Sequence, residues 1–263
     1  MIDLKVKQGK ERIVCLTEEC TEALYLMGEQ DRIVGVSSHT VRPPDARKKP
    51  KVSTFMKAKT EEILDLKPDL IIGFSDIQAD IAQQLIKEGL DVYIANHRSV
   101  SEILTYIHIL GGFIGETQKS LELVEKLQTV ISENTASEKE IRLKTYFEEW
   151  HDPIITGIQW VSECIEIAGG QDVFPHLRHE SLAKNRIIST EKIVEADPEV
   201  IFVSWCGKKY NPNIVKDRES WKTISAVIKK RVFEIPSSLI LQPGPACILE
   251  GLPLIKSHLD MCR

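Results

Sequence analysis

Residues 60–75 read TEEILDLKPDLIIGFS, and residues 190–205 read TEKIVEADPEVIFVSW. Each stretch begins with a short amphipathic pattern that ends before a proline, which cannot continue a helix and disfavours helix in the residue before it. A run of branched apolar residues follows, and such short runs are typical of strands buried on both faces of a parallel sheet. The same helix-then-strand unit is therefore predicted twice in the chain.

A second pair of similar stretches lies upstream of the first pair. Residues 21–33 read TEALYLMGEQDRI and residues 162–174 read SECIEIAGGQDVF, with Glu, Gly, Gln and Asp in the same places. Each begins with a hydroxyl residue suited to a helix N-cap and reaches a glycine where a helix should stop. Because both signatures recur in the same order, we infer that one α/β lobe has been duplicated, with residues 37–59 as an extended loop of the first copy.

The segment between the two lobes keeps apolar residues at helical spacing. Gly111, Gly112 and Gly115 lie in it and allow either close packing or a bend. We expect one long helix, and hence an amino-terminal lobe over residues 1–98, a bridging helix over 99–140 and a carboxyl-terminal lobe over 141–263. The predicted fold class is α/β, with a mainly parallel, Rossmann-like sheet flanked by helices in each lobe.

The composition argues against several classes of protein. The net charge is −5, and the one basic cluster, residues 42–51, is interrupted by prolines, so nucleic-acid binding is not expected. No apolar stretch approaches the ~20 residues of a membrane span, so we expect no membrane-embedded segment. The six cysteines form no C-x-x-C pair and no zinc-type spacing, a pattern that suits a reducing compartment.

The first residues, MIDLKVKQGKERIV, contain neither the apolar core nor the cleavage site of a signal peptide. As written, the chain is therefore expected in the cytoplasm. It is expected in the periplasm, or otherwise outside the cytoplasmic membrane, if a leader peptide has been removed. We expect the protein to be a monomer.

Ligands of open parallel sheets bind at the loops that follow the carboxyl ends of the strands. In the first lobe, the residues predicted there to bind a ligand are Thr17, Glu18, Glu19, Ser38, His39, Phe55, Phe74 and His97. In the second lobe they are Trp150, His151, Trp160 and Trp205. Flat aromatic rings mixed with hydroxyl and imidazole groups suit a wide planar or amphipathic ligand. The alternative is that some of these aromatic residues are core residues that close each sheet.

Metal binding and catalysis have weaker support. The histidines come from separate loops and show no His-Glu-x-x-His spacing, so only folding could assemble a metal site from His39, His97 and His151. Neither a G-x-S-x-G elbow nor a P-loop is present. Glu18 and Glu19 could pair with Glu148 and Glu149 as acid and base, but paired carboxylates at loop ends are common without chemistry. We therefore predict no enzyme activity, no catalytic residue, no catalytic cofactor and no metal ligand.

Several stretches resemble the class III, or helical-backbone, substrate-binding proteins that serve ABC importers for cobalamin, iron-siderophores and haem. They are ERIVCLTEECTEALYLMGEQDRIVGVS (residues 11–37), TEEILDLKPDLII (60–72), EIAGG (166–170), and residues 221–233 followed by PGPACILEGLPLI (243–255). Within this family, YFEEWHDP (146–153) with the following Trp-Val-Ser-Glu is most similar to the cobalamin-binding branch.

The resemblance implies a single long helix between rigid lobes, non-covalent ligand recognition in the cleft between them, and an ABC permease as partner. The leading hypothesis is delivery of cobalamin (vitamin B12) or a related corrinoid. The alternatives are an iron-siderophore, haem or metal-ion binding protein, or an intracellular corrinoid-handling protein of the same fold. Exposed carboxylates of the family dock on permease arginines, and the residues predicted for this role are Asp76, Asp80, Asp217 and Glu219.

One departure from the family bears on the ligand. Family members usually have a Pro-Ser type turn after the first strand, where this chain has Glu18 and Glu19. Two carboxylates near the ligand would disfavour an anionic siderophore by charge repulsion.

Overall fold

The computed structural model describes residues 9–263, apart from the Lys216 side chain, and the chain divides into two compact units. Unit 1 comprises the described residues up to His97 together with Ser101–Leu127. Unit 2 comprises Arg98–Val100 together with Gln128–Arg263. Each unit has its own sheet and its own apolar core, so each is described by itself.

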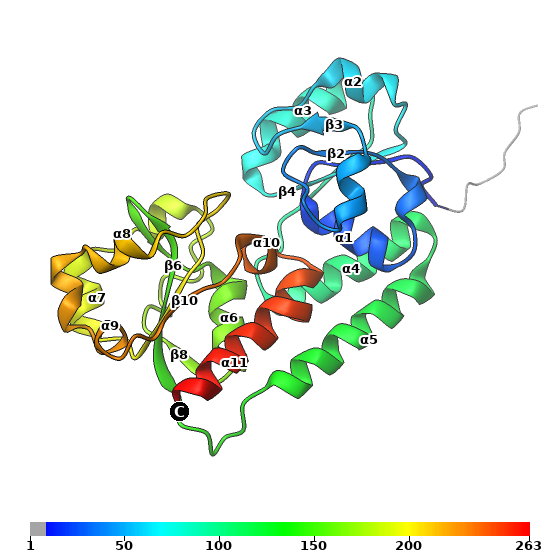
Figure 1. Ribbon diagram of the computed structural model, residues 1–263. Helices are drawn as coiled ribbons and strands as arrows, with labels where there is room; N and C mark the ends of the chain where they lie inside the picture. Colours follow the sequence, from blue (N-terminus) through cyan, green and yellow to red (C-terminus); the bar gives the residue numbers. More distant parts are fainter. Residues whose placement is uncertain (1–8) are drawn as a thin grey trace, which may run out of the picture. The chain divides into compact units, whose positions relative to one another are not determined.

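Unit 1 is built on a five-stranded sheet in the order β3-β2-β1-β4-β5, in which every neighbouring pair is parallel. Strands β2, β3 and β4 are labelled in Figure 1. The strands are β1 (Ile13–Cys15), β2 (Ile33–Ser37), β3 (Lys51–Ser53), β4 (Leu70–Phe74) and β5 (Val92–Ala95). Strands β1 and β4 are buried throughout, as expected for apolar runs covered on both faces. Part of the loop expected over residues 37–59 is instead strand β3, which pairs with β2 at the sheet edge and buries Val52 fully.

The helices of unit 1 follow its strands. They are α1 (Glu18–Leu26), α2 (Thr60–Asp65) and α3 (Ala79–Lys87), with short 3-10 turns η1 (Gln30–Arg32), η2 (Pro44–Lys48) and η3 (Asp76–Gln78). Helix α2 ends before Pro68 as predicted, and α1 ends before Gly28, whose φ of 77° suits glycine. The predicted N-cap at Thr21 is wrong. Helix α1 begins one turn earlier, where Glu18 and Glu19 complement the positive end of the helix dipole.

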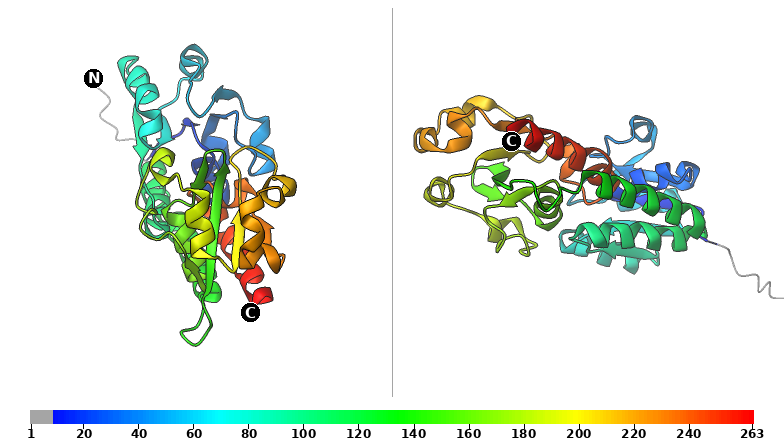
Figure 2. Two further views of the ribbon diagram at one scale, coloured as in Figure 1. Left: turned by 90° about the vertical axis from the view of Figure 1, so that its left-hand side faces the viewer. Right: turned by 90° about the horizontal axis from the view of Figure 1, so that it is seen from below.

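The single helix expected over residues 99–140 is two helices, α4 (Val100–Ile114) and α5 (Thr117–Asn134). Gly115 lies between them with a φ of 73°, a left-handed conformation that ends α4. The end of α4 and the start of α5 lie side by side (Figure 2), and Gly111 is so close to Ser120 that an added Cβ would lie 2.2 Å from the serine hydroxyl oxygen. The expectation of one continuous helix was therefore wrong: Gly115 provides the bend and Gly111 the close packing.

Unit 2 has a second five-stranded sheet around a long central strand. Its strands are β6 (Leu143–His151), β7 (Ile154–Thr156), β8 (Gly170–Asp172), β9 (Val200–Val203) and β10 (Val232–Glu234). Strand β6 pairs with β9 on one side, and β9 pairs with β10. On the other side, β6 pairs with β8 near its start and with β7 near its end. Only β7 is antiparallel, so the sheet is mainly parallel, as predicted.

The helical segments of unit 2 cover this sheet. They are α6 (Gln159–Ile167), α7 (Thr190–Ala196), α8 (Pro212–Lys216), α9 (Ser225–Ile228), α10 (Ser237–Ile240) and α11 (Leu252–Cys262), with η4 (Ala183–Arg186), η5 (Glu219–Thr223) and η6 (Cys247–Gly251). Helix α11 packs against α6 (Figure 1). The core includes Tyr146, Ile201, Trp205 and Trp221. Within residues 9–263, no helix combines the length and the apolar character needed to cross a membrane.

The strand order repeats between the units. In unit 1, the strands β2-β1-β4-β5 are neighbours, and in unit 2 the order is β8-β6-β9-β10, again all parallel. Helix α1 joins the first two strands in chain order in unit 1, and α6 joins their counterparts in unit 2. The recurrence of topology follows the recurrence of sequence, as expected if one lobe was duplicated. Strands β3 and β7 are the additions that distinguish the two copies.

Candidate functional site

Glu18 ties the start of α1 to the loop after β2 in unit 1. Its carboxylate accepts the backbone N–H groups of Val41 and Arg42 at 2.9 and 2.6 Å. The side chain is 5% exposed, and burial raises the pKa of this carboxyl, although the two backbone hydrogen bonds oppose the rise. The Glu18 carboxylate is therefore hydrogen-bonded within unit 1 and is not exposed to solvent.

Glu19 is buried more deeply, at 1% exposure. Its Oε1 accepts a hydrogen bond from the hydroxyl of Thr17, while its Oε2 is buried without a hydrogen-bond partner. Burial raises the pKa of Glu19 to about 7, with smaller contributions from the charges of Glu18 and Glu22. Because both members of the acidic pair are buried, the charge repulsion expected from them has no support in the structure.

Gln78 joins three strand-end loops of unit 1 and was missed by the sequence analysis. Its amide nitrogen donates to the carbonyl oxygens of Leu16 and Phe55 at 3.4 and 3.2 Å, and its amide oxygen accepts the backbone N–H of Phe74 at 2.9 Å. The side chain is fully buried. The loops after β1, β3 and β4 are thus held by one amide, two of whose partners, Leu16 and Phe55, lie 62 and 23 positions away in sequence.

The predicted ligand-binding residues of unit 1 lie at the carboxyl ends of its strands but differ in exposure. Phe74 and His97 are buried, and the rings of His97 and Tyr106 stack with centroids 4.3 Å apart. Ser38 and His39 are exposed after β2, and Phe55 is half-buried after β3. The exposed members are the ones that a ligand can reach in this structure. Their role in binding stays a prediction.

Unit 2 gathers an aromatic cluster where β6 and β9 end, formed by Trp150, His151, Trp205 and Tyr210. The His151 ring lies 4.4 Å from that of Trp205 and 5.0 Å from that of Trp150. The Tyr210 ring meets Trp205 edge-on at 5.3 Å. The ammonium of Lys208 lies 5.7 Å from the Trp150 ring and 3.1 Å from Nε2 of His151. Burial, and then the charge of Lys208, lowers the pKa of His151, so the imidazole is neutral near pH 7.

Glu148 and Glu149, near the end of β6, each form a largely buried ion pair with an arginine. Glu148 is fully buried and accepts both terminal nitrogens of Arg218 at 2.5 and 3.2 Å. Burial raises the pKa of Glu148, and the ion pair with Arg218 opposes that rise. Glu149 pairs in the same fork geometry with Arg186, at 2.5 and 3.1 Å. The two unit 2 carboxylates considered for acid–base chemistry are therefore held by arginines of their own unit.

Two expectations about the tryptophans need correction. Trp160 was expected on a loop, but it lies in helix α6, 4% exposed, with its indole N–H donated to the carbonyl oxygen of Ile240 at 2.8 Å. It packs in the core because α6 turns this side chain inward. Trp150 and His151 were also expected in a loop, but they extend strand β6, because β7 folds back and pairs with them.

The acids predicted to dock on a permease are exposed. Asp76 and Asp80 lie at the start of η3 and α3 in unit 1, and Asp217 follows α8 in unit 2. Glu219 is exposed and pairs with Lys222 at 2.6 Å. Their docking role stays a prediction.

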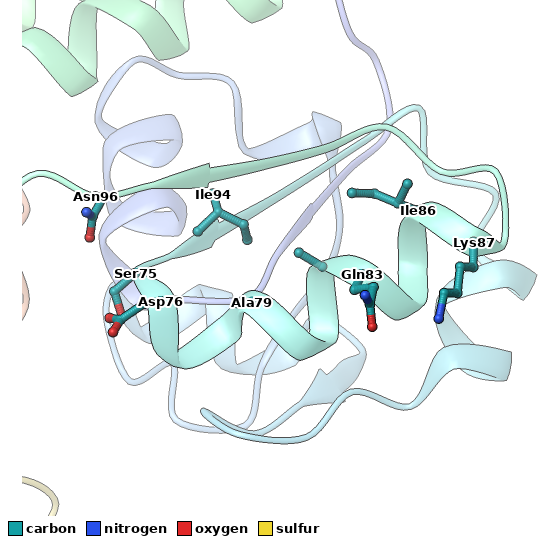
Figure 3. A pocket seen from close by; sticks show the side chains of 9 residues that line it. Ser75, Asp76, Ala79, Gln83, Ile86, Lys87, Ile94 and Asn96 are labelled. Carbon is teal, nitrogen blue, oxygen red and sulfur yellow. The ribbon is translucent and has the colours of Figure 1, made fainter.

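A hollow of about 670 Å³ lies on unit 1 between α3 and β5 (Figure 3). Ala79, Ile86 and Ile94 make its lining largely apolar, with Asp76 near one end and Lys87 near the other. Of the residues predicted from sequence, only Asp76 reaches it. Nothing in the spacing of the sequence signals this hollow, because its walls come from the outer face of a helix and an edge strand.

The three histidines considered for a metal site come from different strand ends of the two units. His39 follows β2 and His97 follows β5 in unit 1, whereas His151 ends β6 in unit 2. Among residues 9–263, no group of three His, Cys, Asp or Glu side chains is placed as metal ligands would be. The strand-end residues offer stacking surfaces and hydrogen-bonding groups, which suit non-covalent recognition of a ligand.

Comparison with known proteins places these features in context. The family described as periplasmic binding protein matches residues 13–239. An uncharacterized ABC transporter substrate-binding lipoprotein of Bacillus subtilis, YvrC, is 27% identical over 95% of this chain and 80% of its own length. The vitamin B12-binding protein of Vibrio vulnificus is 26% identical over 91% of this chain and 86% of its own length.

Solved structures show the same fold. The periplasmic haem-binding protein RhuT of a Roseiflexus species has a TM-score of 0.82 at 20% identity, covering 97% of this chain and 100% of its own. The periplasmic vitamin B12-binding protein BtuF of Vibrio cholerae has a TM-score of 0.77 at 22% identity, covering 96% of this chain and 98% of its own. The fold class predicted from the sequence is thereby confirmed.

Proposed function

The chain belongs to the periplasmic binding protein family, and on that premise we propose that it binds cobalamin or a related corrinoid for delivery to an ABC importer. The family is one of solute-binding proteins, and a substrate-binding role in an ABC importer follows from it. The observation that favours a corrinoid is the similarity to vitamin B12-binding proteins along nine-tenths of the chain, at 26% identity.

The aromatic cluster of unit 2 supplies a suitable surface for such a ligand. A corrinoid has broad apolar ring faces, a rim of amides and, in cobalamin, one phosphodiester. Trp150 offers a partly exposed aromatic face, and Lys208 offers an ammonium group beside it. The only hydrogen bond found for the Lys208 ammonium in the described chain is to neutral His151, so its charge is left for an anionic group of the ligand.

Calorimetric titration with cyanocobalamin tests the proposal. All four tryptophans lie in unit 2, so their fluorescence reports binding there in a parallel titration. We expect saturable heat and quenching with the same midpoint. Absence of both signals at hundreds of micromolar ligand would refute corrinoid binding.

Two substitutions test whether the ligand contacts Trp150. Trp150→Ala should weaken cobalamin binding several-fold, because an aromatic face contact contributes about 1 kcal/mol. Tyr25→Ala removes another partly buried aromatic ring, in the last turns of α1, and should leave the affinity unchanged. Equal effects of the two substitutions would place the ligand elsewhere.

A haem or iron-chelate ligand is the second candidate. The same fold serves haem in the Roseiflexus protein, which has the higher TM-score of the two structures described above. A neutral imidazole such as that of His151 is also a potential ligand for iron. Titration with haemin under the same conditions distinguishes the two: saturable binding of haemin without binding of cyanocobalamin favours this candidate.

We propose that the exposed acids dock on the permease partner. Asp80 is the clearest case, because it is exposed in the first turn of α3. Asp80→Lys should weaken binding to the cognate permease in lipid nanodiscs without changing ligand affinity. Asp31→Lys makes the same charge change at another exposed position of unit 1 and serves as the control.

We propose that the protein works outside the cytoplasmic membrane, because a binding protein that serves an importer must meet its ligand there. Fractionation of cells that express the gene from its native start tests this. Recovery from the cytoplasm alone would instead favour an intracellular corrinoid-handling role.

A further inference from the structure

Cys15 and Cys20 lie on either side of Thr17, Glu18 and Glu19, where strand β1 leads into helix α1. Cys15 is the last residue of β1, and Cys20 lies in the first turn of α1. Their sulfur atoms are 3.2 Å apart, and both residues are fully buried. A disulfide has a bond length of about 2.05 Å, so the two sulfurs need to approach by only about 1 Å. We propose that Cys15 and Cys20 form an intramolecular disulfide when the protein folds in the presence of a small-molecule disulfide.

The chemistry is two successive thiol–disulfide exchanges. The thiolate of one cysteine attacks glutathione disulfide, which forms a mixed disulfide and releases one glutathione. The thiolate of the second cysteine then attacks the cysteine sulfur of the mixed disulfide, forms the Cys15–Cys20 bond and releases the second glutathione. The protein loses two electrons and two protons, and the oxidant is reduced to two thiols.

Burial decides when the reaction takes place. Burial raises the pKa of the Cys20 thiol well above its ordinary value, so the folded protein holds little of the thiolate that exchange requires. In the unfolded chain both thiols are accessible, and only four residues separate them, so closing the loop costs little entropy. The bond therefore forms during folding. The same burial then shields it from reductants.

The other cysteines provide internal comparisons. Cys206 is exposed, so we expect it to take up a single glutathione as a mixed disulfide. Cys164 is fully buried in α6 of unit 2, and its thiol is expected to remain free. The spacing of Cys15 and Cys20 matches no short redox motif, so the sequence alone suits a reducing compartment. The contact between the Cys15 and Cys20 sulfurs instead allows a cross-link under oxidising conditions.

A proteolytic map of the refolded protein tests the cross-link. Unfolded, reduced protein is refolded in a glutathione redox buffer, denatured, alkylated and cleaved after glutamate. Cleavage after Glu18 and Glu19 puts Cys15 and Cys20 on different peptides. We expect these peptides to remain joined and unalkylated until a reductant separates them, while Cys164 is alkylated in full.

Two variants complete the design. Cys20→Ser should abolish the joined peptides, and Cys164→Ser should leave them unchanged. Full alkylation of both Cys15 and Cys20 in the refolded wild-type protein overturns the proposal, as does linkage of either residue to another cysteine. Because the decisive digest uses wild-type protein, a folding defect of Cys20→Ser leaves the test intact.

Discussion

Trp205 donates its indole N–H to the carboxylate of Glu148 across 3.1 Å, so the second residue beyond β9 is held by a buried charge on β6. Arg218 completes the arrangement from a distant loop and also lies 4.2 Å above the ring of Trp221. The orientation of Trp205, and with it the ring contact of His151, therefore depends on one ion pair.

Loss of Arg218 should destabilise unit 2. Arg218→Met leaves the fully buried Glu148 carboxylate without its counter-charge, and breaking a buried pair in this way costs about 3 kcal/mol or more. Unfolding by urea, followed by tryptophan fluorescence, reports unit 2 specifically. We expect a lower free energy of unfolding at pH 7.

The neighbouring pair of Lys222 and Glu219 is the matched control. Both side chains are largely exposed, at 58 and 82%, so Lys222→Met should cost less than about 1 kcal/mol. Similar losses for Arg218→Met and Lys222→Met would contradict the role assigned to the buried pair.

Much of the fold is readable from local sequence. The apolar runs predict β4 and β9 to within a residue or so, because a strand buried on both faces requires a continuous apolar run. The doubled signatures predict the doubled topology. The break between α4 and α5 was not predicted, since a glycine within a helical pattern fits packing and bending equally well. Only the structure shows that Gly115 has a positive φ.

The site is less accessible to sequence reasoning than the fold. Gln78 contacts Leu16 from 62 positions away, and Arg218 contacts Glu148 from 70 positions away. No local pattern marks either residue, because each is placed by the topology of its sheet. The same limit applies to Trp160: a tryptophan near a strand end fits a binding surface or a core, and only the facing direction of α6 decides.

Glu19 should make the stability of unit 1 depend on pH. Its pKa is about 7 in the folded protein against 4.5 as the ordinary value, so the folded state binds the proton more tightly. This stabilisation is fully present below pH 4.5 and is lost as the pH rises through 7. The neutral Glu19→Gln variant should therefore match wild type near pH 4.5 and exceed it by about 3 kcal/mol at pH 8. Hydrogen exchange of the β1 amides measures this difference.

Glu61→Gln controls for the change of net charge in this comparison. Glu61 is exposed on α2, so its substitution should not alter the pH profile of unit 1. A difference between Glu19→Gln and wild type that is constant from pH 4.5 to 8 would show that Glu19 is ionised throughout.

Lys208 should control the titration of His151. Burial is the main cause of the lowered pKa of His151, and the ammonium of Lys208 is the next. Lys208→Met should raise that pKa towards its ordinary value, as followed by NMR titration of the imidazole protons. Lys209→Met removes the adjacent exposed charge and should leave it unchanged. Equal shifts in both variants would mean that net charge, rather than the contact, sets the pKa.

Gly111 and Gly112 should respond in opposite directions to substitution by alanine. At Gly111 an added Cβ would lie 2.2 Å from the Ser120 hydroxyl oxygen and 2.4 Å from the Ser120 Cβ, so the paired ends of α4 and α5 must separate. Overpacking of this kind costs about 1–3 kcal/mol. At Gly112 an added Cβ meets nothing within 4 Å, and alanine is the better helix former by about 0.5–1 kcal/mol. Denaturation followed by far-ultraviolet circular dichroism should therefore show Gly111→Ala below wild type in stability and Gly112→Ala above it. If both variants gain stability, the helices are not in contact at Gly111, and the bend at Gly115 serves some purpose other than this packing.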